Sequence, residues 1–325
     1  MKGMILAAGY GERLWPLTAD RTKPAIPVLG MPLVGYVAGY LAQFGISEVV
    51  VNLHHRPESV KRALGDGRQF GVKLEYVHEP VILGTSGAMD NARSLLEDDT
   101  FIVINGKIIT DIDLNAALRE HKRRGALATL VLLRNKQRER FSIVETHEGL
   151  VTRFAGMPTA DASTGAEPLM FTGIQILEPR IFDYIPPGIF SHSTVDVYPP
   201  AMAKGERIAA HVAEGKWFEL STLQRYLDIS LALLKNEGVN TYCGLDSVVN
   251  ESAVVRDSVL WDGVTIEAGT TVLRSVVGDG VRIPSGEYHE HEVIVRADLI
   301  SGLTPPAKAL KGTIDGENFV VSLSQ

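Results

Sequence analysis

A six-residue repeat near the end of the sequence restricts the possible folds more than any other feature. Aliphatic residues recur there at a fixed spacing, and a small or β-branched residue follows each of the first five by four positions. With one change of register before its last two members, the leading column consists of Val248, Val254, Leu260, Ile266, Val272, Val277 and Ile283. This period is typical of a parallel β-helix, in which each hexad forms one side of a triangular coil. The alternative, accidental spacing in a β-rich tail, requires chance matches in two columns, so we predict a short left-handed β-helix.

Earlier in the chain, short aliphatic runs alternate with amphipathic stretches. We expect buried strands at Met4–Ala7, Glu48–Asn52, Lys73–Val77, Phe101–Ile104 and Ala128–Leu133, and further strands at Phe141–Glu145 and Phe171–Leu177. The stretches between the first five strands predict helices at Leu33–Phe44, Pro57–Leu64, Ser86–Leu96 and Leu114–Arg123. Strands separated by helices indicate an α/β fold with a Rossmann-like, mostly parallel sheet. We therefore expect an α/β domain over residues 1–238, and the β-helix with a tail over residues 239–325.

Charge and cysteine content exclude several classes of function. The formal net charge is −7 and the sequence has no basic block, whereas binding to nucleic acid or to anionic membranes needs concentrated Lys and Arg. No apolar run approaches the ~20 residues of a membrane span. Cys243 is the only cysteine, so no disulfide can form within the chain. We expect a cytoplasmic protein that binds neither nucleic acid nor membranes.

A loop of small residues follows the first expected strand. Four of its residues have little or no side chain: Ala7, Ala8, Gly9 and Gly11. Backbone N–H groups there can approach phosphate oxygens closely. Arg13 and Lys23 add the cationic charge that a triphosphate requires. A dinucleotide-binding fold is the common alternative for such a loop. It needs a third small residue where this chain has Leu14, and an acidic residue where the second strand ends in Asn52, so a dehydrogenase is disfavoured.

The loop is part of a longer motif. It runs Gly9-x-Gly11-x-Arg13-Leu14-x-Pro16-Leu17-Thr18, followed by Lys23-Pro24. Further segments follow in order: Glu79, Leu83-Gly84-Thr85-Ser86-Gly87-Ala88, Asn105-Gly106 and Thr172-Gly173-Ile174. This series resembles the sugar-1-phosphate nucleotidyltransferases. With the hexad repeat, the layout is similar to the mannose-1-phosphate guanylyltransferase branch over nearly the whole chain.

The resemblance implies an activity and assigns roles to residues. In such enzymes a sugar-phosphate oxygen attacks the α-phosphorus of a nucleoside triphosphate and pyrophosphate leaves, so catalysis consists of positioning and charge neutralisation. The implied products are a nucleotide sugar, here a GDP-sugar, and pyrophosphate. Arg13 and Lys23 would stabilise the departing pyrophosphate. The residues implied to bind the nucleotide are Ala7, Ala8, Gly9, Gly11, Glu79, Gly84, Thr85, Gly87, Asn105 and Gly106. Glu79 either contacts the ligand or is a surface carboxylate.

Three positions depart from the family pattern. Where the family has Asn-Gly-Asp, whose Asp holds Mg²⁺, this chain has Asn105-Gly106-Lys107. Where the family has a Glu-Lys-Pro that grips the sugar phosphate, it has Gly156-Met157-Pro158. The second metal-binding Asp is replaced by Glu219. Each change lies where charge decides the chemistry.

Two hypotheses follow from these departures. In the first the chain is an active enzyme, and the Lys107 ammonium, oriented by Glu219, replaces Mg²⁺ at an α-phosphate oxygen. Alternatively, Asp111 and Asp113 recruit Mg²⁺ to a shifted position, with Glu219 as a further possible ligand. Another cation then binds the sugar phosphate; the candidates around the sugar and its phosphate are Arg134, Arg138, Arg140, Arg153, Gly173, His192 and Glu219. The alternative for His192 is a residue at a helix start, with Ser193 or Thr194 as the cap.

In the second hypothesis the site has lost catalysis and kept binding. The chain is then a nucleotide-sugar sensor or the regulatory subunit of an active relative. Under either hypothesis the β-helix is expected to hold copies together as a homo-oligomer. Two weaker signals are set aside: His289 and His291 among glutamates are expected at a solvated edge, and an acyltransferase would need more β-helix coils than this chain has.

Overall fold

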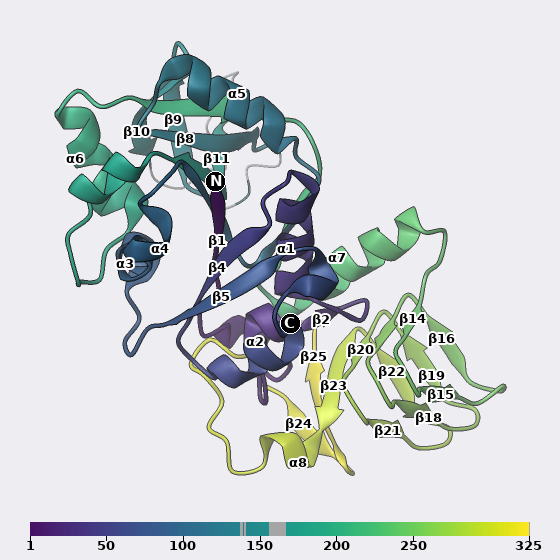
Figure 1. Ribbon diagram of the computed structural model, residues 1–325. Coiled ribbons are helices and arrows are strands. Elements are labelled where there is room, and N and C mark those ends of the chain that lie inside the picture. Colours follow the sequence, from purple (N-terminus) through teal and green to yellow (C-terminus); the bar gives the residue numbers. More distant parts are fainter. Residues whose placement is uncertain (137–138, 140, 156–166, 325) are drawn as a thin grey trace. The chain divides into compact units, whose positions relative to one another are not determined.

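The computed structural model describes residues 1–136, 139, 141–155 and 167–324. Contacts divide the chain into two units. The first, here the sheet unit, comprises Met1–Gly9, Val34–Pro57 and Leu64–Trp217. The second, here the coil unit, comprises Tyr10–Leu33, Glu58–Ala63 and Phe218–Gln325. Figure 1 shows the elements of both units, coloured along the sequence. The small-residue loop is therefore divided, because Gly9 ends one segment and Tyr10 begins the next.

A nine-stranded sheet forms the centre of the sheet unit (Figure 1), in the order β5-β4-β1-β6-β11-β8-β12-β10-β9. The strands are β1 (Lys2–Leu6), β4 (Glu48–Leu53), β5 (Lys73–His78), β6 (Phe101–Asn105), β8 (Ala128–Arg134), β9 (Ile143–His147), β10 (Leu150–Ala155), β11 (Leu169–Leu177) and β12 (Ile208–Val212). Strands β5, β4, β1 and β6 are parallel, as the sequence predicts. Strand β11 is antiparallel to both of its neighbours, β6 and β8. The small-residue loop thus follows a strand in the parallel half of the sheet.

Helices connect the strands of the sheet unit. They are α1 (Leu33–Gln43), α3 (Gly84–Asn91), α4 (Arg93–Leu96), α5 (Leu114–Arg124) and α6 (Tyr198–Ala203). The single helix predicted over Ser86–Leu96 is wrong in one respect, because it is interrupted at Ala92. There the backbone N–H donates to Met89 O, three residues back, at 3.0 Å, and the helical ladder stops. The core beneath the helices contains the fully buried residues Met4, Phe101, Val103, Leu130 and Tyr198.

Short parallel strands form three sheets in the coil unit, and successive strands along the chain belong to different sheets. They are β14 (Tyr242–Cys243), β15 (Val248–Val249), β16 (Val254–Arg256), β17 (Val259–Leu260), β18 (Thr265–Ile266), β19 (Thr271–Leu273), β20 (Val276–Val277), β21 (Arg282–Ile283), β22 (Tyr288–Glu290) and β23 (Glu292–Arg296). Leu260, Ile266 and Val272 are buried in the shared core. This is the arrangement expected of a triangular β-helix. Val248 and Val254, in the first coil, are instead exposed.

The coils repeat every 17 residues. Val259 pairs with Tyr242 in one direction and with Val276 in the other, and Ser275 N donates to Ser258 Oγ across the same 17-residue interval. Three full hexads would make a coil of about 18 residues. One side of each coil is therefore a residue short, so the change of register seen in the sequence is a regular feature of this coil.

The coil unit also contains most of helix α2 (Pro57–Leu64), helices α7 (Leu223–Asn236) and α8 (Ala297–Ile300), and a hairpin of β24 (Thr313–Asp315) and β25 (Asn318–Ser322). Strand β25 pairs antiparallel with β23. The ring of Phe319 on β25 meets that of Trp15 edge-on, with centroids 5.2 Å apart. Trp261 Nε1 donates to the Tyr226 hydroxyl at 2.7 Å, and that hydroxyl donates to Pro27 O at 2.7 Å. Residues 10–33 are thus packed against the β-helix and its hairpin.

The expectation of a solvated edge at His289 is wrong. This side chain is buried, and its two ring nitrogens lie 2.8 Å from a Glu292 carboxylate oxygen and 3.0 Å from one of Glu287. Carboxylates on both sides satisfy the ring, so burial carries no desolvation penalty for an unpaired group.

No helix in the described part of the chain is both long and apolar enough to cross a membrane.

Candidate active site

A chain of buried hydrogen bonds joins the ends of three parallel strands in the sheet unit. Asn52, at the end of β4, accepts from the Ala7 N–H at 2.7 Å through its side-chain oxygen. Its amide donates to Glu79 Oε1 at 2.6 Å, just after β5. The side chain of Asn52 therefore ties the start of the small-residue loop to the next strand end. In the sequence, Asn52 served only as an argument against a dinucleotide-binding fold, and this linking role was not predicted.

Glu79 is fully buried, so it is not a surface carboxylate. Its second oxygen accepts from the Leu83 N–H at 3.1 Å, and its backbone carbonyl lies 2.8 Å from His54 Nδ1. Both carboxylate oxygens are thus engaged by Asn52 and Leu83. Glu79 thereby joins the end of β4 to the segment that begins at Gly84.

The segment from Gly84 to Gly87 packs tightly on residues 189–193. A Cβ at Gly87 would lie 2.5 Å from Ile189 O, and one at Gly84 would meet Ser191 O. The Ser193 N–H donates to Thr85 Oγ1 at 3.0 Å. His192 is exposed and occupies the N-cap position itself, without a side-chain capping bond. These glycines therefore allow two backbone segments to touch, and His192 lies at their junction.

Asn105, Gly106 and Gly173 meet at the end of β6. The Gly106 N–H donates to Leu6 O at 2.9 Å, and a Cβ on Gly106 would lie 2.9 Å from the same oxygen. Gly173 has a φ of +82° where the pairing of β11 with β8 shifts register, and a Cβ there would collide with the Asn105 amide. Lys107, half-buried, follows directly. The bulge at Gly173 thus leaves room for the side chain of Asn105, two residues before Lys107.

A pocket of about 240 Å³ in the coil unit is lined by three of the predicted phosphate ligands, Gly11, Arg13 and Lys23. The other lining residues are Tyr10, Glu12, Ser221 and Lys308. Gly11 has a φ of +71°, and a Cβ on it would lie 2.8 Å from the Cβ of Lys23. Only glycine permits both this backbone conformation and this close approach. The pocket brings three cationic side chains and one carboxylate to one place.

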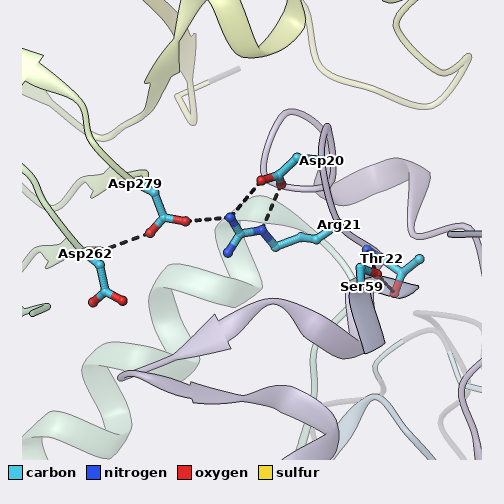
Figure 2. A network of polar contacts seen from close by, with 6 residues as sticks. All are labelled: Asp20, Arg21, Thr22, Ser59, Asp262 and Asp279. Atoms are coloured by element: carbon cyan, nitrogen blue, oxygen red, sulfur yellow. Dashed lines mark hydrogen bonds and ion pairs between the residues drawn. The ribbon is translucent and has the colours of Figure 1, made fainter. Parts of the chain in front are cut away.

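Arg21, two residues before Lys23, lies in a polar cluster that the sequence did not reveal. Figure 2 shows its guanidinium between the carboxylates of Asp20 and Asp279. Arg21 Nε donates to Asp20 at 2.8 Å, and its Nη2 donates to Asp279 at 2.5 Å. The guanidinium also lies over the Trp261 ring, 5.1 Å from the centroid. Burial alone would lower the pKa of Arg21, but its bonds to Asp20 and the charge of Asp279 outweigh this effect and raise it.

The cluster fixes the segment before Lys23 to the β-helix. The Thr22 N–H donates to Ser59 Oγ at 3.1 Å, so two successive residues are held (Figure 2). We expect Arg21→Ala to lower the free energy of unfolding by about 1–2 kcal/mol, since the three charges are partly exposed and solvent screens them. Urea unfolding measures this loss. Lys61→Ala removes an exposed ion pair with Glu58 and serves as the control, expected to cost under ~0.5 kcal/mol. Equal losses would contradict a structural role for the cluster.

The remaining predicted residues belong to both units. Arg153 is exposed on β10 and paired with Glu145, with Nε 3.0 Å from the carboxylate. Glu219 is buried in the coil unit, and its carbonyl accepts from Arg225 Nε at 3.0 Å. Lys107 and Glu219 belong to different units, so their pairing stays a prediction. Arg138, Arg140 and Gly156-Met157-Pro158 lie outside the described residues.

The two carboxylates of the sheet unit that were suggested for Mg²⁺ each accept a hydrogen bond from a backbone N–H. Asp111 Oδ1 accepts from the Lys216 N–H at 2.6 Å, and Asp113 caps α5 by accepting from the Asn115 N–H at 2.9 Å. Within the described ranges, no group of three or more His, Cys, Asp or Glu side chains is placed to hold a metal ion. The ammonium of Lys107 has no lone pair with which to bind a metal ion. Mg²⁺ commonly binds one or two carboxylates together with substrate phosphates and water, so the choice between Mg²⁺ and Lys107 stays a prediction. The chemistry considered below uses the cations of this chain.

A mixed sheet with a parallel half, and a small-residue loop after a strand of that half, is typical of a nucleotide-binding α/β protein. The pattern of the nucleotidyl transferase family matches residues 2–236, and this chain belongs to that family. The resemblance to sugar-1-phosphate nucleotidyltransferases that the motifs indicated is thereby confirmed.

Relatives in this family carry different nucleotides in their names. The chain is 28% identical to a Synechocystis UTP–glucose-1-phosphate uridylyltransferase, over 98% of this chain and 88% of that protein. It is 29% identical to the mannose-1-phosphate guanylyltransferase of Mycobacterium tuberculosis, over 87% and 81%. It is 34% identical to the N-acetylmuramate α-1-phosphate uridylyltransferase of Neisseria meningitidis, over 69% and 95%.

A solved structure shares the fold. The crystal structure of a Bacillus anthracis protein assigned as a glucose-1-phosphate thymidylyltransferase superposes with a TM-score of 0.62. The two chains are 24% identical, and the match covers 72% of this chain and 94% of the other. At this level of identity the likeness supports the fold alone.

Proposed function

We propose that this chain joins a nucleoside triphosphate to a sugar-1-phosphate, giving a nucleotide sugar and pyrophosphate, with GTP as the nucleotide. The observation that carries the proposal is the pocket in which Gly11, Arg13 and Lys23 meet. GTP is supported by the guanylyltransferase relative, which aligns over most of both chains. The two uridylyltransferases make UTP the competing nucleotide.

The proposed reaction needs no covalent intermediate with the protein. An oxygen of the sugar phosphate attacks the α-phosphorus, a new P–O bond forms, and the bond to the β-phosphate oxygen breaks. Its electron pair leaves with pyrophosphate. Arg13 and Lys23 neutralise the charge that accumulates on the leaving group. Lys107 neutralises an α-phosphate oxygen as the transition state forms.

A grid of nucleoside triphosphates and sugar-1-phosphates tests the proposal. Pyrophosphate release is measured in each pair, once with Mg²⁺ and once with EDTA. Release with GTP as the preferred nucleotide supports the proposal in full. Release with UTP or dTTP instead replaces the nucleotide, and silence in every pair contradicts the activity.

A second candidate function rests on Lys107. A cation at a position where the family binds metal is also what a site that has lost catalysis would show. The chain would then bind a nucleotide sugar and alter the rate of an active relative. Silence in the grid, together with tight binding of a GDP-sugar or UDP-sugar in calorimetry, favours this second function.

We also propose that copies associate through the first coil of the β-helix. Strands β14, β15 and β16 each end their sheet in the described part of the chain, and Leu245 and Val248 are exposed there. An open strand edge with aliphatic side chains favours pairing. Light scattering after gel filtration should show an oligomer that Val248→Glu dissociates, and a monomeric wild type contradicts this part of the proposal.

A further inference from the structure

Lys308 is far along the sequence from every predicted phosphate ligand. It lines the same pocket as Gly11, Arg13 and Lys23. Its Nζ lies 3.8 Å from Glu12 Oε2, and its side chain is 72% exposed. Neither the motif nor the hexad repeat contains this residue, so neither indicates a role for it.

The backbone around Lys308 is ordered by local contacts. Lys308 lies in a turn that the Ala309 N–H closes by donating to Pro306 O at 2.9 Å. A few residues on, a Cβ at Gly312 would lie 2.5 Å from Val320 O, so the returning chain rests directly on β25. The same strand carries Phe319, whose ring meets Trp15. The turn therefore holds Lys308 close to the small-residue loop.

The charges of the other residues that line the pocket indicate what Lys308 contributes to it. Arg13 and Lys23 bring two cations, but Glu12 places a carboxylate among them. A carboxylate beside phosphate oxygens raises the energy of a bound polyphosphate. The ammonium of Lys308 offsets that charge, so the pocket keeps the two net positive charges that Arg13 and Lys23 supply.

The size of the pocket indicates which part of the substrate it takes. A volume of about 240 Å³ is below the ~300–1,000 Å³ of pockets that enclose a whole small-molecule ligand. It is therefore suited to a fragment. The concentration of cations indicates that this fragment is the terminal phosphates, which depart as pyrophosphate.

We propose that Lys308 binds the β- and γ-phosphates of the nucleotide, and holds the pyrophosphate that they become. This inference rests on the proposed function for the identity of the anion. In the ligand-free protein Lys308 pairs with Glu12. When the anion binds, the ammonium turns from Glu12 to the phosphate oxygens and forms a charge-assisted hydrogen bond.

Direct binding of inorganic pyrophosphate tests this role without requiring turnover. Calorimetric titration of the full chain compares the wild type with Lys308→Ala, Lys308→Arg and Lys311→Ala. We expect Lys308→Ala to raise the Kd for pyrophosphate about tenfold, the effect of losing one charge-assisted hydrogen bond, and Lys308→Arg to retain most of the affinity. Lys311 lies in the same segment and is exposed, so Lys311→Ala is the matched control and should change the Kd less than about twofold.

A fourth variant examines the carboxylate. Glu12→Gln keeps the size of the side chain and removes the charge, so we expect it to lower the Kd for pyrophosphate. An unchanged Kd in Lys308→Ala, or equal losses in Lys308→Ala and Lys311→Ala, would overturn the proposal. So would a wild type that does not bind pyrophosphate.

The outcomes for Lys308 and for the proposed function can be separated. Pyrophosphate binding that depends on Lys308, in a chain silent throughout the substrate grid, supports the role of Lys308 and contradicts the proposed activity. Turnover in the grid, with normal pyrophosphate binding in Lys308→Ala, supports the proposed activity and contradicts the role of Lys308. In an active chain, Lys308→Ala should raise the KM for the nucleotide and leave the KM for the sugar-1-phosphate unchanged.

Discussion

Replacing Lys107 with alanine is expected to lower kcat for pyrophosphate release by about a hundred- to a thousandfold. The reason is electrostatic, since the ammonium neutralises charge on an α-phosphate oxygen chiefly in the transition state. An interaction of this kind changes kcat more than KM. Lys107 is half-buried, where a cation interacts more strongly with phosphate than it would in water. Steady-state kinetics with the substrate pair found in the grid measures the loss.

The metal dependence of the wild type decides whether Lys107 performs this role. If it replaces Mg²⁺, turnover should persist in EDTA. A strict requirement for Mg²⁺ in the wild type, or normal kcat in Lys107→Ala, would contradict the ammonium hypothesis. Lys107→Asp restores the carboxylate that the family carries at this position. An Mg²⁺-dependent gain of activity in Lys107→Asp, from a silent wild type, would show that position 107 had switched the site off.

Features that depend on local sequence were predicted well. Strands β1, β4, β5, β6 and β8 each lie within two residues of their predicted bounds, because aliphatic runs ended by turn residues specify a buried strand without reference to the rest of the chain. The β-helix was predicted for the same reason, since its six-residue repeat is a local pattern in the sequence. The position of Gly11, Arg13 and Lys23 around one pocket follows from their closeness along the chain.

Features that depend on distant pairings were not predicted. The antiparallel placement of β11 between β6 and β8 depends on strand order, which periodicity does not encode. Arg21 and Asp279 are 258 residues apart, and Lys308 is farther still from Glu12 along the chain. Isolated charged residues of this kind look like ordinary surface residues in a sequence. Glu79 is a further case, because the sequence left open a surface carboxylate, whereas both of its oxygens accept hydrogen bonds inside the protein.

The two glycines of the loop should respond differently to alanine. Gly9 has no atom within 4 Å of where a Cβ would be, so Gly9→Ala should change the free energy of unfolding by less than about 0.5 kcal/mol. We nevertheless expect kcat/KM for the nucleotide to fall about a hundredfold, because a Cβ would keep a phosphate oxygen from the backbone N–H and displace the reacting atoms. Kinetics and urea unfolding of the same preparation measure both effects.

Gly11→Ala is the contrasting variant. Its backbone φ of +71° and the Cβ of Lys23 at 2.8 Å oppose any side chain in the ligand-free protein. We expect a loss of about 2 kcal/mol in the free energy of unfolding, from a strained backbone and a contact that must shift, together with a fall in activity. If Gly9→Ala retained normal kcat/KM, no phosphate would approach that residue, and the loop would owe its small residues to folding. Loss of activity without loss of stability in Gly9→Ala therefore isolates the space that the nucleotide occupies.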